Sequence, residues 1–161
     1  MTLLWIPLLS LIGSVISSCT SKLTRNQSTA LTMLAPLIAL GIVFSYTPAV
    51  FSGETIRYTA DWIPLLNMQV SFRLDGLSLL FLYMILGIGT LVIFYARYYL
   101  SINDSLPKLY CYLMLFMTAM VGIVMSNNVI QLWLFWELTS ISSFLLISYW
   151  WHKSEARKGA R

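Results

Sequence analysis

Charged residues are scarce in this sequence, and their scarcity excludes an ordinary soluble domain. Of the 161 residues, 10% are charged and 58% are hydrophobic, whereas a soluble domain carries about 25% charged residues. A single buried core in a chain of this length has no room for so much apolar surface. The mean hydropathy of +0.78 therefore indicates an integral membrane protein.

The chain has only two cysteines, Cys19 and Cys111, and both lie near the ends of long apolar stretches. Their number and spacing indicate neither a disulfide framework nor a metal site, so we expect both to serve packing. The stretch "VISSC" that ends at Cys19 resembles a lipoprotein processing site. A secretory leader begins with basic residues, however, and none precedes Lys22, which favours a first helix that is retained.

Five long apolar stretches account for most of the chain. Each approaches the roughly 20 residues with which an α-helix crosses a bilayer. The other spanning architecture, a closed barrel, is built from short strands of alternating hydropathy, whereas these stretches are apolar on all sides. We therefore predict an all-α integral membrane protein whose helices cover residues 3–19, 28–50, 76–99, 109–125 and 129–151.

The connection between the second and third helices, residues 51–75, is the longest one. From Gln69 to Leu74, hydrophobic and polar residues alternate, which is typical of a half-buried strand. The stretch "ETIRYTA" upstream is also rich in residues that favour strands. We predict a small external β-hairpin within this connection.

Basic residues are distributed unevenly, and their distribution predicts the orientation in the membrane. If the chain crosses five times, only Arg57 and Arg73 lie on one side of the membrane. The other eight lie on the opposite side: Lys22, Arg25, Arg97, Lys108, Lys153, Arg157, Lys158 and Arg161. Because positive residues stay cytoplasmic, we expect the N-terminus outside and the C-terminus in the cytoplasm. The net charge of +4 then reflects topology, and no nucleic-acid partner is needed to explain it.

Asp75 directly precedes the third predicted helix. Its carboxylate can accept hydrogen bonds from the free backbone N–H groups of the first turn, and it lies at the positive end of the helix dipole. We expect Asp75 to act as a helix cap. A role in ion entry is the alternative.

Glu137 is the one acidic residue inside the apolar part of a predicted helix. Counted from Asn128 at about 1.5 Å per residue, it lies roughly 13 Å deep in a hydrocarbon layer of about 30 Å. A carboxylate at that depth costs on the order of 2.5–3.5 kcal/mol and marks an ion pathway by default. The cost falls if the group is protonated or faces a cation or water. The alternative is a structural hydrogen bond between helices.

Three residues extend the face of Glu137 toward the cytoplasm. Ser140 and Ser148 lie on that face at helical spacing, and His152 lies roughly in line beyond them. They predict a broken polar track. The alternative is that the serines bond to their own helix carbonyls. Basic residues lie only at or beyond the ends of the five helices, so the counter-ion of Glu137 must lie elsewhere.

Two stretches resemble the N-terminal part of the large antiporter-like subunits. They are "FRLDGLSLLFLYMILGIGTLVIFYARYYL", which begins at Phe72, and "NNVIQLWLFWELTSISSFLLI", which begins at Asn127. The family includes the large A-type component of the Mrp-type multisubunit monovalent cation/proton antiporters and membrane-arm subunit five of respiratory complex I. Both branches share "DGLS" and "WE". The stretch "WELTSISSFLLI" is similar to the antiporter branch, whereas the complex I branch reads closer to "WEGVG".

The resemblance implies that Glu137 is the acidic half of a Glu–Lys pair in the proton or ion path. The Lys would lie on a later helix, beyond these residues. It also implies an inverted-repeat fold and a hetero-oligomeric complex in the bacterial plasma membrane. Residues 1–161 would then be the N-terminal transmembrane region of a larger subunit, and the basic "KSEARKGAR" would lead to a next helix.

The resemblance leaves two functions open. The first is secondary transport, in which protons entering the cell drive Na⁺ or K⁺ out. The second is redox-driven proton pumping as one component of complex I. A membrane scaffold in which Glu137 only packs is a third alternative. No flavin, iron–sulfur or nucleotide motif is present, so we expect no cofactor, no metal site and no catalytic residue in this chain.

Overall fold

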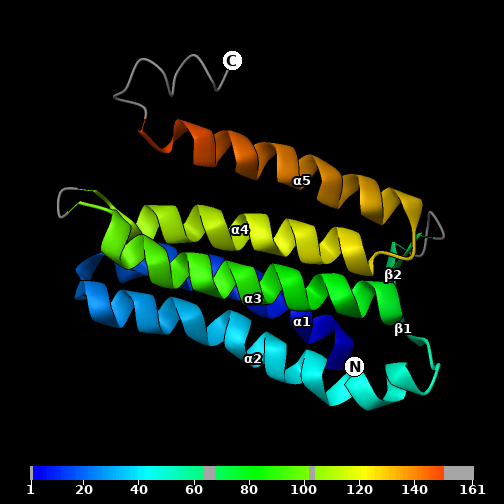
Figure 1. Cartoon of the computed structure of the whole chain (residues 1–161). Helices are drawn as coiled ribbons and strands as arrows, with labels where there is room; N and C mark the ends of the chain where they lie inside the picture. The colour runs from blue at the N-terminus through cyan, green and yellow to red at the C-terminus, as the bar shows by residue number, and fades with distance from the viewer. Residues whose placement is uncertain (1, 64–67, 102–103, 151–161) are drawn as a thin grey trace.

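The computed structural model describes residues 2–63, 68–101 and 104–150 as a bundle of helices with a two-stranded sheet at one end (Figure 1). Five of the helices are long and apolar enough to cross a membrane. The fold class predicted from the sequence is confirmed. The elements are Thr2–Leu4 (3-10), α1 Trp5–Cys19, Thr20–Lys22 (3-10), α2 Arg25–Phe51, β1 Ile56–Ile63, β2 Met68–Leu74, α3 Gly76–Tyr99, α4 Leu106–Met125, α5 Val129–Ile147 and Ser148–Trp150 (3-10).

Successive helices run in alternating directions, so their connections gather at the two ends of the bundle (Figure 1). The hairpin end holds β1, β2 and the start of α5. The basic end holds the α1–α2 and α3–α4 connections, near which Arg25, Arg97 and Lys108 lie. The unequal distribution of basic residues is therefore a feature of the folded chain. The direction of the bundle in the membrane stays a prediction.

The hairpin lies within the connection where alternation predicted it. β1 and β2 are antiparallel, with Tyr58 opposite Phe72 and an irregularity between Asp61 and Ile63. Phe72 and Leu74 are buried, as the alternation requires. The hairpin therefore packs one face on the helices.

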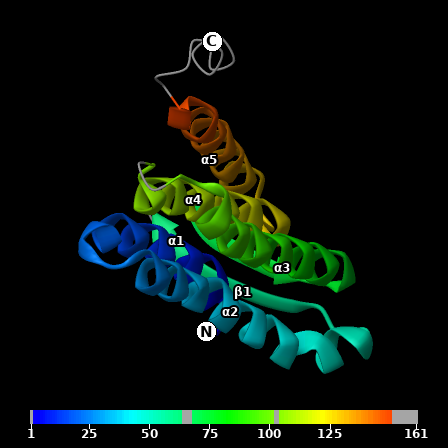
Figure 2. The same cartoon turned by 60° about the vertical axis from the view of Figure 1, so that its left-hand side comes forward.

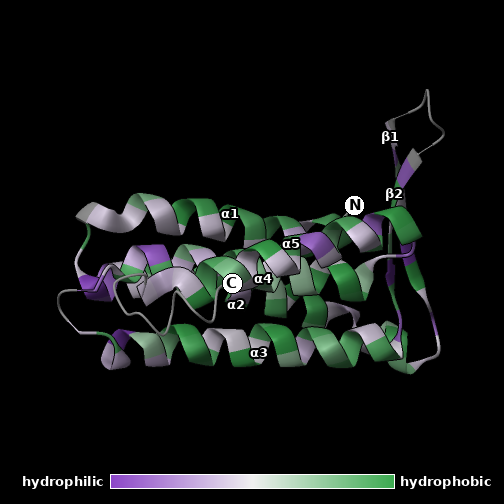
Figure 3. Cartoon of the chain, turned by 90° about the horizontal axis from the view of Figure 1, so that it is seen from above, coloured by the Kyte–Doolittle hydropathy of each residue, from purple (hydrophilic) through white to green (hydrophobic). Residues whose placement is uncertain are grey.

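α4 is the central helix of the bundle. It contacts α1, α3 and α5. None of its large hydrophobic residues is among the exposed ones, which lie mainly on the other four helices. Figure 3 shows that hydrophobic residues run along the helices of the bundle. Gly13 of α1 lies where α1, α2 and α4 meet, because a Cβ there would come within 2.8 Å of the Ala35 Cβ of α2 and would meet the end of the Met114 side chain of α4. Ser14 adds a hydrogen bond of 3.0 Å from its hydroxyl to the backbone oxygen of Cys111.

The start of α2 differs from the predicted bound. The helix begins at Arg25 rather than at residue 28, because Thr24 and Gln27 form a capping box. The Thr24 hydroxyl accepts from the backbone N–H of Gln27, and the Gln27 side chain accepts from the backbone N–H of Thr24. Two free N–H groups are satisfied in this way, which makes the additional turn stable.

Arg25 joins α2 to the end of α3. Its guanidinium donates to the backbone oxygens of Leu100 at 2.9 Å, Ser101 at 3.1 Å and Arg97 at 3.4 Å. Carbonyls at a helix C-terminus lack partners within the helix, and a cation is favoured there. Arg25 therefore stabilises the packing of α2 on the end of α3. It is also one of the basic residues that lie at the basic end of the bundle.

Two further helix ends differ from the prediction. α4 begins at Leu106 rather than at residue 109, because Pro107 suits a first helical turn, where no N–H is needed. α5 was predicted to reach residue 151. Its α-helical part ends at Ile147 and is continued by a 3-10 turn to Trp150, and residue 151 lies outside the described residues.

Candidate functional site

The candidate site lies on α5, which packs on α4 along one side (Figure 2). Asn128 caps the helix, with its side-chain oxygen 2.9 Å from a backbone nitrogen of the first turn. Close packing on α4 depends on Gly122, because a Cβ there would overlap the ring of Phe135. Within α5 only Gln131 and Ser142 are buried. Most of the helix surface therefore faces away from the rest of the bundle.

Glu137 is the ninth of the 19 residues of α5, which places it at the middle of the helix. Its side chain is exposed on the outside of the bundle. Nothing in residues 2–63, 68–101 or 104–150 forms a hydrogen bond or an ion pair with its carboxylate. A carboxylate in apolar surroundings is relieved either by a proton or by a cation that comes from elsewhere.

Residues that share the face of Glu137 at helical spacing form one outer strip. Trp133, Ile141 and Phe144 are 57%, 55% and 49% exposed, and Ser140 is exposed between them. The strip is apolar except for Glu137 and Ser140. It is therefore a surface suited to hydrocarbon or to another helix, with one carboxylate at its centre.

The polar track predicted beyond Glu137 consists of Ser140, Ser148 and His152. Ser140 belongs to the exposed strip, whereas Ser148 is half-buried and donates to the backbone oxygen of Leu145 at 3.2 Å. That bond is the alternative that the sequence left open for this serine. His152 lies outside the described residues, so the track itself stays a prediction.

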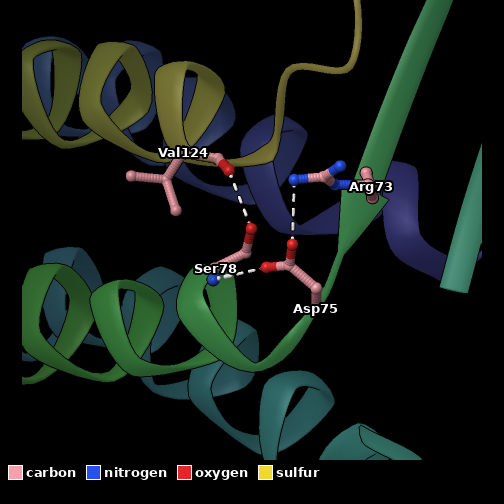
Figure 4. A network of polar contacts seen from close by, with 4 residues as sticks. All are labelled: Arg73, Asp75, Ser78 and Val124. Carbon is pink, nitrogen blue, oxygen red and sulfur yellow. Dashed lines mark hydrogen bonds and ion pairs between the residues drawn. The ribbon is translucent and has the colours of Figure 1, made fainter. Parts of the chain in front are cut away.

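Asp75 lies at the N-terminus of α3, at the hairpin end. Its carboxylate accepts from the backbone N–H of Ser78 at 2.8 Å and pairs with Arg73 at 2.9 Å (Figure 4). The bond from the Ser78 backbone lowers the pKa of Asp75, burial opposes that effect, and the Ser78 hydroxyl and Arg73 lower the pKa further. Asp75 thus holds the start of α3. The sequence had not indicated its ion pair with Arg73.

Ser78 carries this network on to α4. Its hydroxyl donates to the backbone oxygen of Val124 at 3.0 Å (Figure 4). Within the described part of the chain, no group of three or more His, Cys, Asp or Glu side chains could hold a metal ion. The geometry around Asp75 is accordingly that of a structural junction between β2, α3 and α4.

The sequence reasoning missed a second junction, between β2 and the start of α5. The buried Gln131 side chain accepts from the backbone N–H of Ser71 at 2.8 Å. The backbone N–H of Asn127 donates to the Ser71 oxygen at 2.9 Å, and the Asn128 side chain donates to the Gln69 oxygen at 3.2 Å. Polar residues at the first turn of an apolar helix, as in "NNVIQ", were the available indication.

Two family models match the chain. One, described as the N-terminus of chain 5 of NADH-ubiquinone oxidoreductase (complex I), matches residues 62–111. The other, described as NADH:quinone oxidoreductase/Mrp antiporter, TM, matches residues 126–160. The second matched region contains α5.

Curated relatives and a solved structure agree with these matches. The chain is 47% identical to the A1 subunit of the Na⁺/H⁺ antiporter of Staphylococcus aureus (strain JH9) over 126 residues, which are 78% of this chain and 16% of that protein. It is 45% identical to the A/B subunit of the probable K⁺/H⁺ antiporter of Rhizobium meliloti (strain 1021) over 140 residues, which are 84% of this chain and 14% of that protein. A chain in the structure of the Mrp complex from Dietzia sp. DQ12-45-1b is similar with a TM-score of 0.74 and 26% identity, over 92% of this chain and 16% of that chain.

The chain spans between 14% and 18% of the length of the curated relatives it matches. The regions matched by the two family models contain β2, Asp75 and the helix that carries Glu137.

Proposed function

This chain belongs to the family of the large A-type components of Mrp-type cation/proton antiporters, as the sequence resemblance predicted, and we propose that it is part of a secondary transporter. In the proposed reaction, protons that enter the cell drive Na⁺ or K⁺ out. Five helices of membrane-spanning type and the antiporter relatives support a multi-pass protein of the bacterial plasma membrane. Residues 1–161 would be the N-terminal transmembrane region of a larger subunit.

The observation that carries the proposal is the position of Glu137. It lies at the middle of α5, on an outer apolar strip, and no described residue neutralises it. Such a carboxylate is stable in hydrocarbon when protonated and needs a nearby cation when ionised. Glu137 would therefore take up a proton from one side and release it as a cation approaches. Ser140, Ser148 and His152 would extend its path toward the cytoplasm.

The proposed partners of Glu137 lie outside this chain. A Lys on a later helix of the complete subunit would face the outer strip of α5 and pair with the ionised carboxylate. Other subunits of a hetero-oligomeric complex, the lipid bilayer, protons and Na⁺ or K⁺ would be the remaining partners. The names of the relatives, one from a Na⁺/H⁺ and one from a K⁺/H⁺ antiporter, support both cations.

The proposed orientation has the hairpin end outside and the basic end in the cytoplasm. Arg25, Arg97 and Lys108 lie at the basic end, and Arg57 and Arg73 lie in the hairpin. The positive-inside rule supports this direction. In that orientation the hairpin faces the side from which protons enter.

A second function rests on the family model that describes complex I chain 5, which matches residues 62–111. In that function the same carboxylate would serve a pump driven by NADH oxidation in other subunits. The curated relatives named above, at 45–47% identity, are antiporter subunits, which favours transport.

The test uses inside-out vesicles that contain the complete complex, with a dye that reports the pH gradient. If the proposal is right, added Na⁺ or K⁺ collapses the gradient, and Glu137→Gln abolishes the collapse. Glu54→Gln is the matched control, because Glu54 is exposed in the α2–β1 connection, and it should behave as the native complex does.

Two results would contradict the proposal. If cations leave the gradient unchanged while Glu137→Gln lowers NADH-driven acidification, the complex I function is supported instead. If Glu137→Gln assembles normally and changes neither process, Glu137 is structural.

A further inference from the structure

We propose that Gln131 is a positioning residue: its hydrogen bond with Ser71 sets the rotation of α5 about its own axis, and thereby the direction in which Glu137 faces. Only the last step, in which the rotation of α5 affects proton exchange at Glu137, rests on the proposed function. The rotation itself is a structural property of this chain.

α5 has few other contacts that could fix its rotation. Among the helices, α4 is its main neighbour. On the hairpin side, the rings of Phe135 and Phe72 are in contact, with centroids 6.4 Å apart. A cavity of about 320 Å³ beside them is lined by Leu134 and Leu138 of α5 and by Trp62 and Val70 of the hairpin. A helix held by one neighbouring helix and one ring contact can still roll, so an additional restraint is needed to give it one orientation.

The hydrogen bonds of Ser71 supply that restraint. β2 has β1 along one edge, and on its other edge the backbone N–H and oxygen of Ser71 bind Gln131 at 2.8 Å and Asn127 at 2.9 Å. The Asn127 side chain also donates to the Ser71 hydroxyl at 3.2 Å. The α4–α5 connection and the first turn of α5 are thus attached to one residue of the sheet.

Gln131 is the member of this set that controls rotation. Asn127 precedes the helix, whereas Gln131 belongs to it and projects from one side of its first turn. Ser71 and Gln131 are 6% and 7% exposed, so water cannot readily replace their bond. Loss of the acceptor would leave a buried backbone N–H without a partner, which is costly. The bond therefore favours one rotation of α5 over its neighbours.

The rotation matters because of where Glu137 lies along the helix. Glu137 follows Gln131 by six positions, so both belong to one rigid segment of α5, about 9 Å apart along the axis. A roll at Gln131 turns Glu137 by the same angle. A proton-transferring group must be held close to its productive geometry, so such a roll lowers the exchange rate.

The first readout is structural and does not depend on transport. Single cysteines are placed at Ile141, which is 55% exposed, and at Ser142, which is fully buried. In the complete complex, the ratio of their maleimide labelling rates, measured by peptide mass mapping, reports the rotation of α5. We expect Gln131→Met, which keeps the length of the side chain and removes the acceptor, to change this ratio at least about twofold.

The second readout is exchange. Gln131→Met should slow cation-driven proton movement roughly tenfold, the usual effect of removing a residue that orients a functional group, and should shift its pH profile. Gln131→Glu retains an acceptor for Ser71 and should restore much of the rate. Gln69→Met is the matched control, because the Gln69 side chain is exposed and bonds to Asp61 within the hairpin.

Each result decides the proposal. If Gln131→Met leaves the labelling ratio unchanged, control of the rotation by Gln131 is overturned whatever happens to transport. If the ratio changes and exchange does not, the link from the rotation of α5 to Glu137 is overturned. If Glu137→Gln itself leaves exchange intact, the proposed function fails, and the labelling ratio still decides whether Gln131 controls the rotation. Should Gln131→Met fail to assemble, Gln131→Leu removes the same acceptor for the Ser71 backbone N–H and should change the ratio in the same direction.

Discussion

α4 and α5 are consecutive helices of nearly equal length, with 20 and 19 residues, yet the chain uses them differently. Their most apolar stretches have mean hydropathies of 1.7 and 1.5. In the α4 stretch 44% of the residues are buried, against 11% in the corresponding stretch within Val129–Trp150, which comprises α5 and its 3-10 extension. Hydropathy thus identifies both as spans and does not distinguish the central helix from the outer one.

The difference decides how polar groups are accommodated. In α4 the Tyr110 hydroxyl is buried and bonded to Thr29 at 2.8 Å and to the backbone oxygen of Ile93 at 3.1 Å. In α5 Glu137 lies on the outer surface without such partners in the described part of the chain. A satisfied hydroxyl stabilises one packing arrangement, whereas an unpaired carboxylate is available to protons and to residues that come from elsewhere.

The largest effect on stability should come from removing a buried side chain of α4. Met114 is fully buried, so Met114→Ala leaves a cavity and should cost about 2–5 kcal/mol. Ile141 of α5 is 55% exposed, and Ile141→Ala should change stability by no more than about 0.5 kcal/mol. Thermal unfolding of the purified complex compares the two. Equal losses would mean that the outer strip of α5 is as tightly packed as α4.

The contact between the two helices should be next in size. A side chain at position 122 would overlap the Phe135 ring, so Gly122→Leu should destabilise the α4–α5 packing by about 1–3 kcal/mol. Gly87→Leu is the matched control, because nothing lies within 4 Å of a Cβ at Gly87. Unfolding of the two variants should separate them clearly. A Gly122 variant as stable as the Gly87 variant would show that α5 can move away from α4 without loss.

The cap of α3 should have the smallest effect, and its charge adds a pH dependence. Asp75→Ala should cost about 1 kcal/mol. Because folding lowers the pKa of Asp75, its ionised form stabilises the fold above the unfolded pKa of about 3.9, and that contribution is lost as pH falls through the folded pKa. Asp75→Asn keeps the cap and removes the titration. Unfolding measured from about pH 3 to pH 6 should therefore show a smaller decrease for Asp75→Asn than for the native complex.

Local sequence features predicted much of the fold. Five long apolar stretches predicted five helices, alternation from Gln69 to Leu74 predicted a strand, and Asp75 before an apolar stretch predicted a cap at the position where the structure has one. Each of these rests on residues close together in the chain. The early start of α2 was also readable in principle, because Thr24 and Gln27 have capping-box spacing.

The contacts of the candidate site were not predictable in the same way. Gln131 binds Ser71, which is 60 residues away in the sequence, and no local pattern records that pairing. The exposure of Glu137 was equally hidden, because α5 is apolar on all sides and its sequence does not indicate which side meets α4. The face of α5 that is buried depends on the contact between Gly122 of α4 and Phe135 of α5.

In the proposed function, Glu137 gains and loses a proton in competition with the transported cation. A hydrophobic carbodiimide tests it in the native complex, because this reagent modifies protonated carboxyl groups in apolar surroundings, and peptide mass mapping identifies the residue. We predict that Glu137 is modified, that modification falls as pH rises, and that Na⁺ or K⁺ reduces it at constant pH, while the exposed Glu54 shows no such response. A Glu137 that stays unmodified at every pH, or whose modification is indifferent to both cations, would contradict the claim.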